Sequence, residues 1–206
     1  MKRVQKKDSG GESGSAKPNA IVLAGLQLFT QYGYRKTSVD DIARVAQVAK
    51  RTVYLHFENK AAVFLAILEY LANQVRQRCA AADHAEGTAV DRLTRLLDAY
   101  FGTGFELFGK SEHMPELKET FSKLARTRVG NLNTEYGNRL VKFLRSLEKT
   151  GEIGRPPQGL TVEQVVHILI RTAEATKHDP EIQGDRRALD RRLRELAILA
   201  IGAMRK

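Results

Sequence analysis

Residues 37–60 read TSVDDIARVAQVAKRTVYLHFENK, and this stretch decides the fold of the first part of the chain. Ser38 is followed three residues later by Asp41, which is the spacing of a capping box, so a helix is predicted to begin there. A short turn then leads into a second helical segment that begins near Lys50. The stretch therefore predicts two short helices joined by a tight turn, as in a helix-turn-helix.

The second of these helices carries side chains suited to nucleic acid. Arg51 can donate two hydrogen bonds to guanine, Lys50 can reach guanine or a phosphate, and Thr52 offers a hydroxyl and a methyl group. Three further donors suit phosphates: Tyr54, His56 and Lys60. Val53 and Phe57 are four residues apart and are predicted to face inward. The alternative is an ordinary set of exposed polar residues on a small helical bundle.

Charge is unevenly distributed along the 206 residues. The net charge is +10, and residues 1–60 hold 11 Lys and Arg against 5 Asp and Glu. More than half of the excess positive charge thus lies in less than a third of the chain. A polyanionic partner explains this asymmetry, since phosphate contacts supply most non-specific affinity for nucleic acid. A basic but merely solvated surface is the alternative.

The bulk composition also limits where the protein acts. Cys79 is the only cysteine, so no disulfide can form within the chain. No apolar h-region follows the basic start MKRVQKK, and no apolar run reaches the roughly 18 residues of a membrane span. We expect a cytoplasmic protein without a membrane partner.

The rest of the chain is predicted to be helical throughout. Thr88 with Asp91 and Thr161 with Gln164 repeat the capping pattern, and apolar residues recur at helical spacing. No window alternates long enough to indicate strands. The expectation is an all-α protein of about nine helices. It is divided into a disordered basic arm (1–16), a three-helix DNA-binding domain (17–70), and a helical effector-binding and dimerisation domain (71–206).

At these residues the chain resembles a known family. Residues 18 to about 70 are similar to the DNA-binding domain of TetR/AcrR bacterial transcriptional regulators, in the stretch from Ala24 to Tyr34, in TSVDDIA and in TVYLHFENK. The resemblance implies an all-α homodimer that binds a palindromic double-stranded DNA operator, usually a repressor released by a small-molecule effector. By position it implies that Lys50, Arg51 and Thr52 contact the operator from the recognition helix. Tyr54, His56 and Lys60 would contact the backbone, and Ser38 a phosphate.

Two positions depart from the family pattern. Gln47 occupies a turn position usually held by Gly, which is unfavourable if φ is positive there. Ala49 stands at the cap of the recognition helix, where Ser is common, so the helix is predicted to lack a side-chain cap. Asp40 sits where some relatives have a basic residue and is not expected to contact DNA.

The effector domain gives weaker signals. Aromatic residues surround Gly102 and Gly104, and a glycine inside a helix requires a reason such as close packing or room for a ligand. The candidate effector-binding residues are Phe101, Phe105, Phe108, Arg128, His167 and Arg171. The alternatives are a plain core for the aromatic residues, a protein salt bridge for Arg128, and an interface hydrogen-bond network or a solvated face for His167 and Arg171. The apolar faces of the last two helices are predicted to form a four-helix dimer bundle, in which Val162, Val166, Leu169 and Ala173 take part.

Other function classes find little support in the residues. There is no Gly-rich phosphate loop, nucleophile motif or carboxylate pair that would indicate an enzyme, and no cofactor or metal site is predicted. The main hypothesis is a ligand-responsive repressor. The alternatives are an architectural DNA-binding protein that needs no ligand, and a ligand-binding protein whose DNA-binding domain is vestigial.

Overall fold

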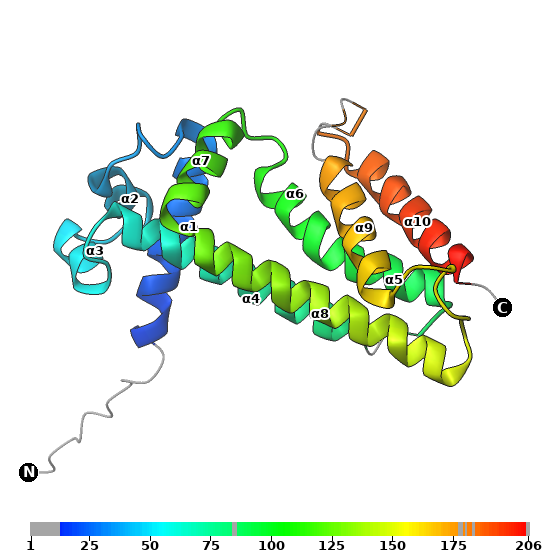
Figure 1. Cartoon of the computed structure of the whole chain (residues 1–206). Coiled ribbons are helices and arrows are strands. Elements are labelled where there is room, and N and C mark those ends of the chain that lie inside the picture. Colours follow the sequence, from blue (N-terminus) through cyan, green and yellow to red (C-terminus); the bar gives the residue numbers. More distant parts are fainter. Residues whose placement is uncertain (1–12, 84–85, 177–178, 180, 183, 205–206) are drawn as a thin grey trace, which may run out of the picture.

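A computed structural model describes residues 13–83, 86–176, 179, 181–182 and 184–204 (Figure 1). Every regular element within these ranges is helical, which confirms the all-α prediction. Helix α5 (Ala89–Leu97), the π-helical turn η1 (Asp98–Gly102) and helix α6 (Thr103–Phe108) follow one another without a break. Counted as one segment, they bring the described helices to nine, the predicted number.

The first four helices are α1 (Ser13–Tyr32), α2 (Val39–Val45), α3 (Lys50–His56) and α4 (Lys60–Asp83). Helix α1 begins earlier than predicted, so residues 13–16 are helical and do not belong to a disordered arm. Residues 1–12 of that predicted arm lie outside the described residues. Pro18 consequently lies inside the helix, in its second turn. The early start has a physical reason: once the later turns of α1 are packed, each added residue costs little, so the helix extends through small residues of low helix propensity.

The predicted helix caps are present. Each of the three capping boxes has both its hydrogen bonds, in the pairs Ser38–Asp41, Thr88–Asp91 and Thr161–Gln164. At the start of α4, Asn59 Oδ1 accepts a hydrogen bond of 2.9 Å from the backbone N–H of Ala62. These bonds satisfy backbone donors that no helical carbonyl can reach, and so they fix where the helices begin.

The remaining helices are α7 (Met114–Leu124), α8 (Arg126–Thr150), α9 (Val162–Ala175) and α10 (Arg186–Ala203). Figure 1 shows α4 and α8 as long helices that run from the α1–α3 end of the molecule toward α9 and α10. Ion pairs join the two: Arg76 contacts Glu135 at 3.0 Å, and Arg139 contacts Asp83. No helix in the described ranges combines the length and apolar character that a membrane crossing needs.

The buried residues form two hydrophobic clusters. The N-terminal cluster contains the inward faces of α1, α2 and α3 and the first part of α4, up to Leu71. The C-terminal cluster begins at Val75 and takes in α5, α8, α9 and α10. The predicted domain boundary at residue 70 therefore falls inside one continuous helix. Phe108 and Leu117, which follow that boundary by many residues, pack in the N-terminal cluster.

The apolar stripes of the last two helices lie elsewhere than predicted. Val162, Val166, Leu169 and Ala173 are all buried within the chain's own C-terminal cluster, so they are not available for a dimer bundle. Periodicity marks which face of a helix is apolar, but it cannot distinguish an internal neighbour from a second copy. The large apolar side chains that α9 and α10 leave exposed are Ile168, Ile198 and Leu199.

The two glycines within the α5–α6 segment have different surroundings. Gly102 ends the π-helical turn, where a Cβ would collide with the side chain of Asp98 and approach Arg186. Those two side chains form an ion pair of 2.5 Å that links η1 to the start of α10. Gly102 thus permits close packing, one of the two reasons considered. No atom lies within 4 Å of the position a Cβ would take at Gly104.

Candidate nucleic-acid interface

Helix α3 is attached to the protein by one face. Val53 is only 1% exposed and packs in the N-terminal cluster, with Phe57 partly buried against it. At 3.6 residues per turn, Arg51 and Leu55 fall on the side opposite Val53, and both are exposed. The helix therefore presents its full outer face to solvent at one end of the molecule (Figure 1).

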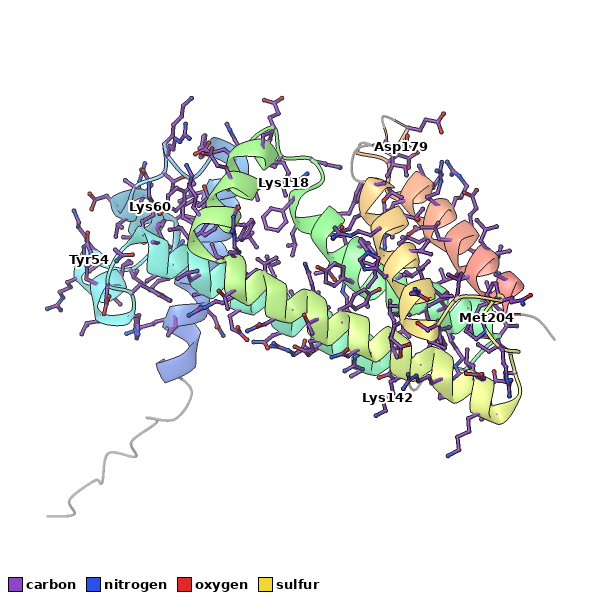
Figure 2. The ribbon with its side chains drawn as sticks, in the orientation of Figure 1. Tyr54, Lys60, Lys118, Lys142, Asp179 and Met204 are labelled. Carbon is purple, nitrogen blue, oxygen red and sulfur yellow. The ribbon has the colours of Figure 1, made fainter. Side chains whose placement is uncertain are left out.

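The predicted base-reading and phosphate-binding residues of α3 lie on or beside this outer face. Arg51, Tyr54 and His56 are exposed, and Thr52 is partly exposed. Figure 2 shows Tyr54 at the outer edge of the α2–α3 end. The structure thus brings these side chains together on one surface of a short helix. Their contacts with DNA remain a prediction.

Lys50 is held by a carboxylate from the neighbouring helix. Its Nζ donates a hydrogen bond of 2.9 Å to Asp40 Oδ2, and both side chains are more than half exposed. This hydrogen bond, with the negative charge behind it, raises the pKa of Lys50. To contact a base or phosphate, the ammonium has to leave Asp40 or use its two remaining donors, and in either case the carboxylate remains close to the DNA.

We therefore expect the Asp40→Asn substitution to strengthen DNA binding. It removes a negative charge beside the phosphates and frees Lys50, so affinity should rise about two- to fivefold at low salt, and less at high salt. Folding stability should change little, because exposed ion pairs contribute about 0–1 kcal/mol. Anisotropy titrations at two salt concentrations measure the effect. Unchanged or weaker binding would show that Lys50 does not reach the DNA.

Lys60 is placed differently from the other predicted contacts. Its Nζ donates to the backbone carbonyls of Tyr34 at 2.7 Å and Thr37 at 2.8 Å, with a longer contact of 3.4 Å to Arg35. It also lies 4.4 Å from the centroid of the Tyr34 ring, and burial lowers its pKa. An ammonium has three donors, so in this arrangement none is left for a phosphate. Lys60 ties the α1–α2 loop to the start of α4.

Ser38 is likewise engaged within the protein. Its hydroxyl bonds to Asp41 Oδ2 at 2.5 Å and accepts the N–H of Asp41 at 3.1 Å. The bonds from Ser38 are the main cause of the lowered pKa of Asp41. Ser38 is exposed at the start of α2, but its one hydroxyl donor is taken by Asp41, so the hydroxyl would have to rotate away from Asp41 to donate to a phosphate. Its phosphate contact remains a prediction.

The turn between α2 and α3 has both of the unusual features that the sequence indicated. Gln47 has a φ of 55°, the left-handed region that favours glycine. Ala49 caps α3 with extended backbone and without a side-chain hydrogen bond. Two exposed residues near this surface were missed: Arg44 on α2, which pairs with Asp41, and Leu55 on α3. The signal for Leu55 was its position opposite Val53.

The predicted effector residues fall in two cavities and in the two hydrophobic clusters. His167 and Arg171 line a cavity of about 340 Å³ between α8, α9 and η1, together with Tyr100, Tyr136 and Ile170. Arg128 lines a smaller cavity of about 140 Å³ between α4 and α8. The candidate residues therefore do not share one cavity, and their role in effector binding remains a prediction.

The three phenylalanines are core residues. Phe101 is buried and Phe105 partly buried in the C-terminal cluster, while Phe108 is buried in the N-terminal cluster. They belong to the plain core that was the alternative, and none lines either cavity. Arg128 is exposed and has no ion pair with any carboxylate in the described ranges.

The larger cavity is lined by aromatic, aliphatic and polar side chains. The rings of Tyr100 and Tyr136 are stacked with centroids 4.3 Å apart, and burial raises the pKa of Tyr100 to about 12. Tyr100 Oη also forms a hydrogen bond with Asn133. Among the lining residues of α9, Arg171 pairs with Glu174 at 3.1 Å. The cavity thus offers a small molecule both aromatic rings and hydrogen-bonding side chains.

Comparisons with known proteins agree with this architecture. Residues 21–67 match the family model "Bacterial regulatory proteins, tetR family". The chain is 38% identical over 58 residues to the uncharacterized HTH-type transcriptional regulator YhgD of Bacillus subtilis, covering 28% of this chain and 30% of that protein. It is 24% identical over 161 residues to the fatty acid metabolism regulator protein of the same organism, covering 76% of this chain and 79% of that protein.

Solved structures share the fold along nearly the whole chain. The fatty acid degradation regulator FadR from Bacillus halodurans superposes with a TM-score of 0.65 at 20% identity, covering 98% of this chain and 99% of that one. The family match in the helix-turn-helix and the regulators named above support a DNA-binding transcriptional regulator. The helix-turn-helix segment of this chain is thus a TetR-family DNA-binding domain.

Proposed function

We propose that this protein is a repressor that binds a palindromic operator as a homodimer and is released when a small molecule enters its C-terminal domain. The observation that carries the DNA-binding part is the outer face of α3, where Arg51, Tyr54 and His56 are exposed on a helix anchored by Val53. Bases in a major groove are accessible to side chains presented in this way. The protein would act in the cytoplasm, where the operator DNA is.

The proposed dimer forms through α9 and α10. These helices leave Ile168, Ile198 and Leu199 exposed, by 53%, 47% and 68% respectively. Apolar side chains of this size on neighbouring helices favour a second copy as partner. Two copies related by a twofold axis would present two α3 helices, which matches a palindromic operator. Sedimentation of the wild type and of the Ile198→Asp variant tests this interface, with a monomeric variant as the expected result.

The proposed effector site is the cavity of about 340 Å³ that contains His167 and Arg171. One relative of the chain, from Bacillus subtilis, is named a fatty acid metabolism regulator. Fatty acids are therefore the first compounds to test as effectors. Helix α7 offers a route from this cavity to the DNA-binding domain. It lies between α6, which continues η1, and α8; η1 and α8 both line the cavity, and Leu117 of α7 packs in the N-terminal cluster.

Binding to DNA tests the proposal first. Fluorescence anisotropy compares the DNA upstream of the protein's own gene with a scrambled duplex over a series of salt concentrations. A large preference for the upstream duplex is expected from a site-specific regulator. Equal and steeply salt-dependent binding to both duplexes, confirmed with sequences selected from a random pool, would instead indicate the architectural alternative.

The Gly137→Leu substitution tests the effector cavity. Gly137 lines the cavity, and a Cβ there would lie 3.8 Å from Ile170 Cδ1, so a leucine side chain extends into the ligand space. Gly130 lies on the same helix with no atom within 4 Å of a Cβ position, which makes Gly130→Leu a matched control. Both changes favour the helix by about 0.8 kcal/mol.

We expect Gly137→Leu to bind the operator with normal affinity. Its release should need at least about a tenfold higher effector concentration, because the leucine side chain occupies the pocket. Gly130→Leu should respond as the wild type does. An unchanged response of Gly137→Leu would place the effector elsewhere.

A further inference from the structure

Leu55 is the most exposed large hydrophobic residue on the described surface. It is 80% exposed, more than Leu199 at 68% or Tyr54 at 49%. It lies at the outermost side of α3, opposite Val53, which is 1% exposed. No intramolecular packing therefore accounts for an aliphatic side chain at this position.

The neighbours of Leu55 indicate what covers it. Arg51 precedes it by one helical turn on the same outer face, and Tyr54 and His56 flank it; all three are exposed. Cationic and hydrogen-bonding groups around an apolar tip do not match an apolar protein groove. They match the major groove of DNA, where phosphates line the edges. The apolar group that a base pair offers there is the C5-methyl of thymine.

We propose that Leu55 reads the methyl group of a thymine in each operator half-site. The inference rests on the proposed operator binding and specifies which base that operator contains. Four residues of α-helix rise by about 6 Å, and base pairs are about 3.4 Å apart. A thymine contacted by Leu55 thus lies about two base pairs from a guanine contacted by Arg51.

The test removes one methyl group from the DNA. The wild-type protein first selects duplexes from a random-sequence pool, and the enriched duplex becomes the probe. Each thymine in one half-site is then replaced singly by uracil, which differs from thymine only in lacking the methyl group. Anisotropy titrations compare the affinities of the wild type, Leu55→Ala and a control variant, Leu124→Ala. Leu124 is an exposed leucine, 40% accessible, on α7.

The wild type and Leu124→Ala should bind one uracil-substituted duplex about fourfold more weakly than the thymine duplex, the effect of one buried methyl group. Leu55→Ala should bind both duplexes equally. The proposal is overturned if no uracil substitution affects the wild type, or if Leu55→Ala still discriminates. A pool that yields no enriched sequence would refute operator binding itself, an outcome distinct from equal binding of thymine and uracil.

Discussion

Replacing Arg51 with Ala is expected to lower the affinity for the operator by about 5- to 150-fold, the range for losing one bidentate contact to guanine. Arg51 is exposed on the outer side of α3, and none of the ion pairs in the described part of the chain involves it. Its guanidinium is therefore available for DNA, whereas Asp40 competes for the ammonium of Lys50. Anisotropy with the selected operator measures the loss.

The matched control for Arg51 is Arg155, an exposed residue of the loop that follows α8. Arg155→Ala removes the same charge far along the chain and should leave the affinity within about twofold, since separated surface charges are screened by salt. Replacing the contacted guanine by 7-deazaguanine should weaken the wild type but not Arg51→Ala. If both proteins lose equal affinity, Arg51 binds the backbone and does not read a base.

The second large effect is expected at Phe64. Its ring is 1% exposed and lies 5.6 Å from Phe29, 5.2 Å from Tyr34 and 4.5 Å from Phe121, measured between ring centroids. Phe64→Ala should lower the free energy of unfolding by about 3–5 kcal/mol, because it removes buried apolar surface and leaves a cavity among three helices. Urea unfolding followed by circular dichroism measures the change.

Phe64→Leu is the companion variant. It keeps most of the apolar volume but removes the aromatic contacts, so a loss of about 1–2 kcal/mol is expected. If Phe64→Ala unfolds in two separate transitions, the N-terminal cluster unfolds apart from the C-terminal one. A loss below about 1 kcal/mol for Phe64→Ala would contradict the packing described here.

The features predicted correctly from the sequence are local ones. The capping boxes at Ser38 and Thr161 and the strained Gln47 depend on residues within a few positions of one another. Their spacing alone carries the information. The inward orientation of Val53 follows for the same reason, since it needs only the period of a helix.

Features that depend on distant segments could not be read in this way. The carbonyls that bind Lys60 come from residues more than 20 positions earlier, so its charge alone suggested a phosphate contact. Likewise, Phe101 and Phe108 belong to one aromatic stretch of sequence but pack in two different clusters, and no residue near them in the sequence indicates this. The cavity beside His167 is formed by three segments, and only the tertiary structure brings them together.

The packing of α7 also bears on how such regulators diversify. Phe121 lies 4.5 Å from Phe64, and the carboxylate of Glu116 accepts the backbone N–H of Arg35 at 2.7 Å. A chimera that joined residues 1–70 to the remainder of a relative would bring a foreign helix against these groups. Recombination between relatives should thus succeed only when α7 and the helix-turn-helix domain come from the same parent. The segments that must be inherited together are therefore not contiguous in the sequence.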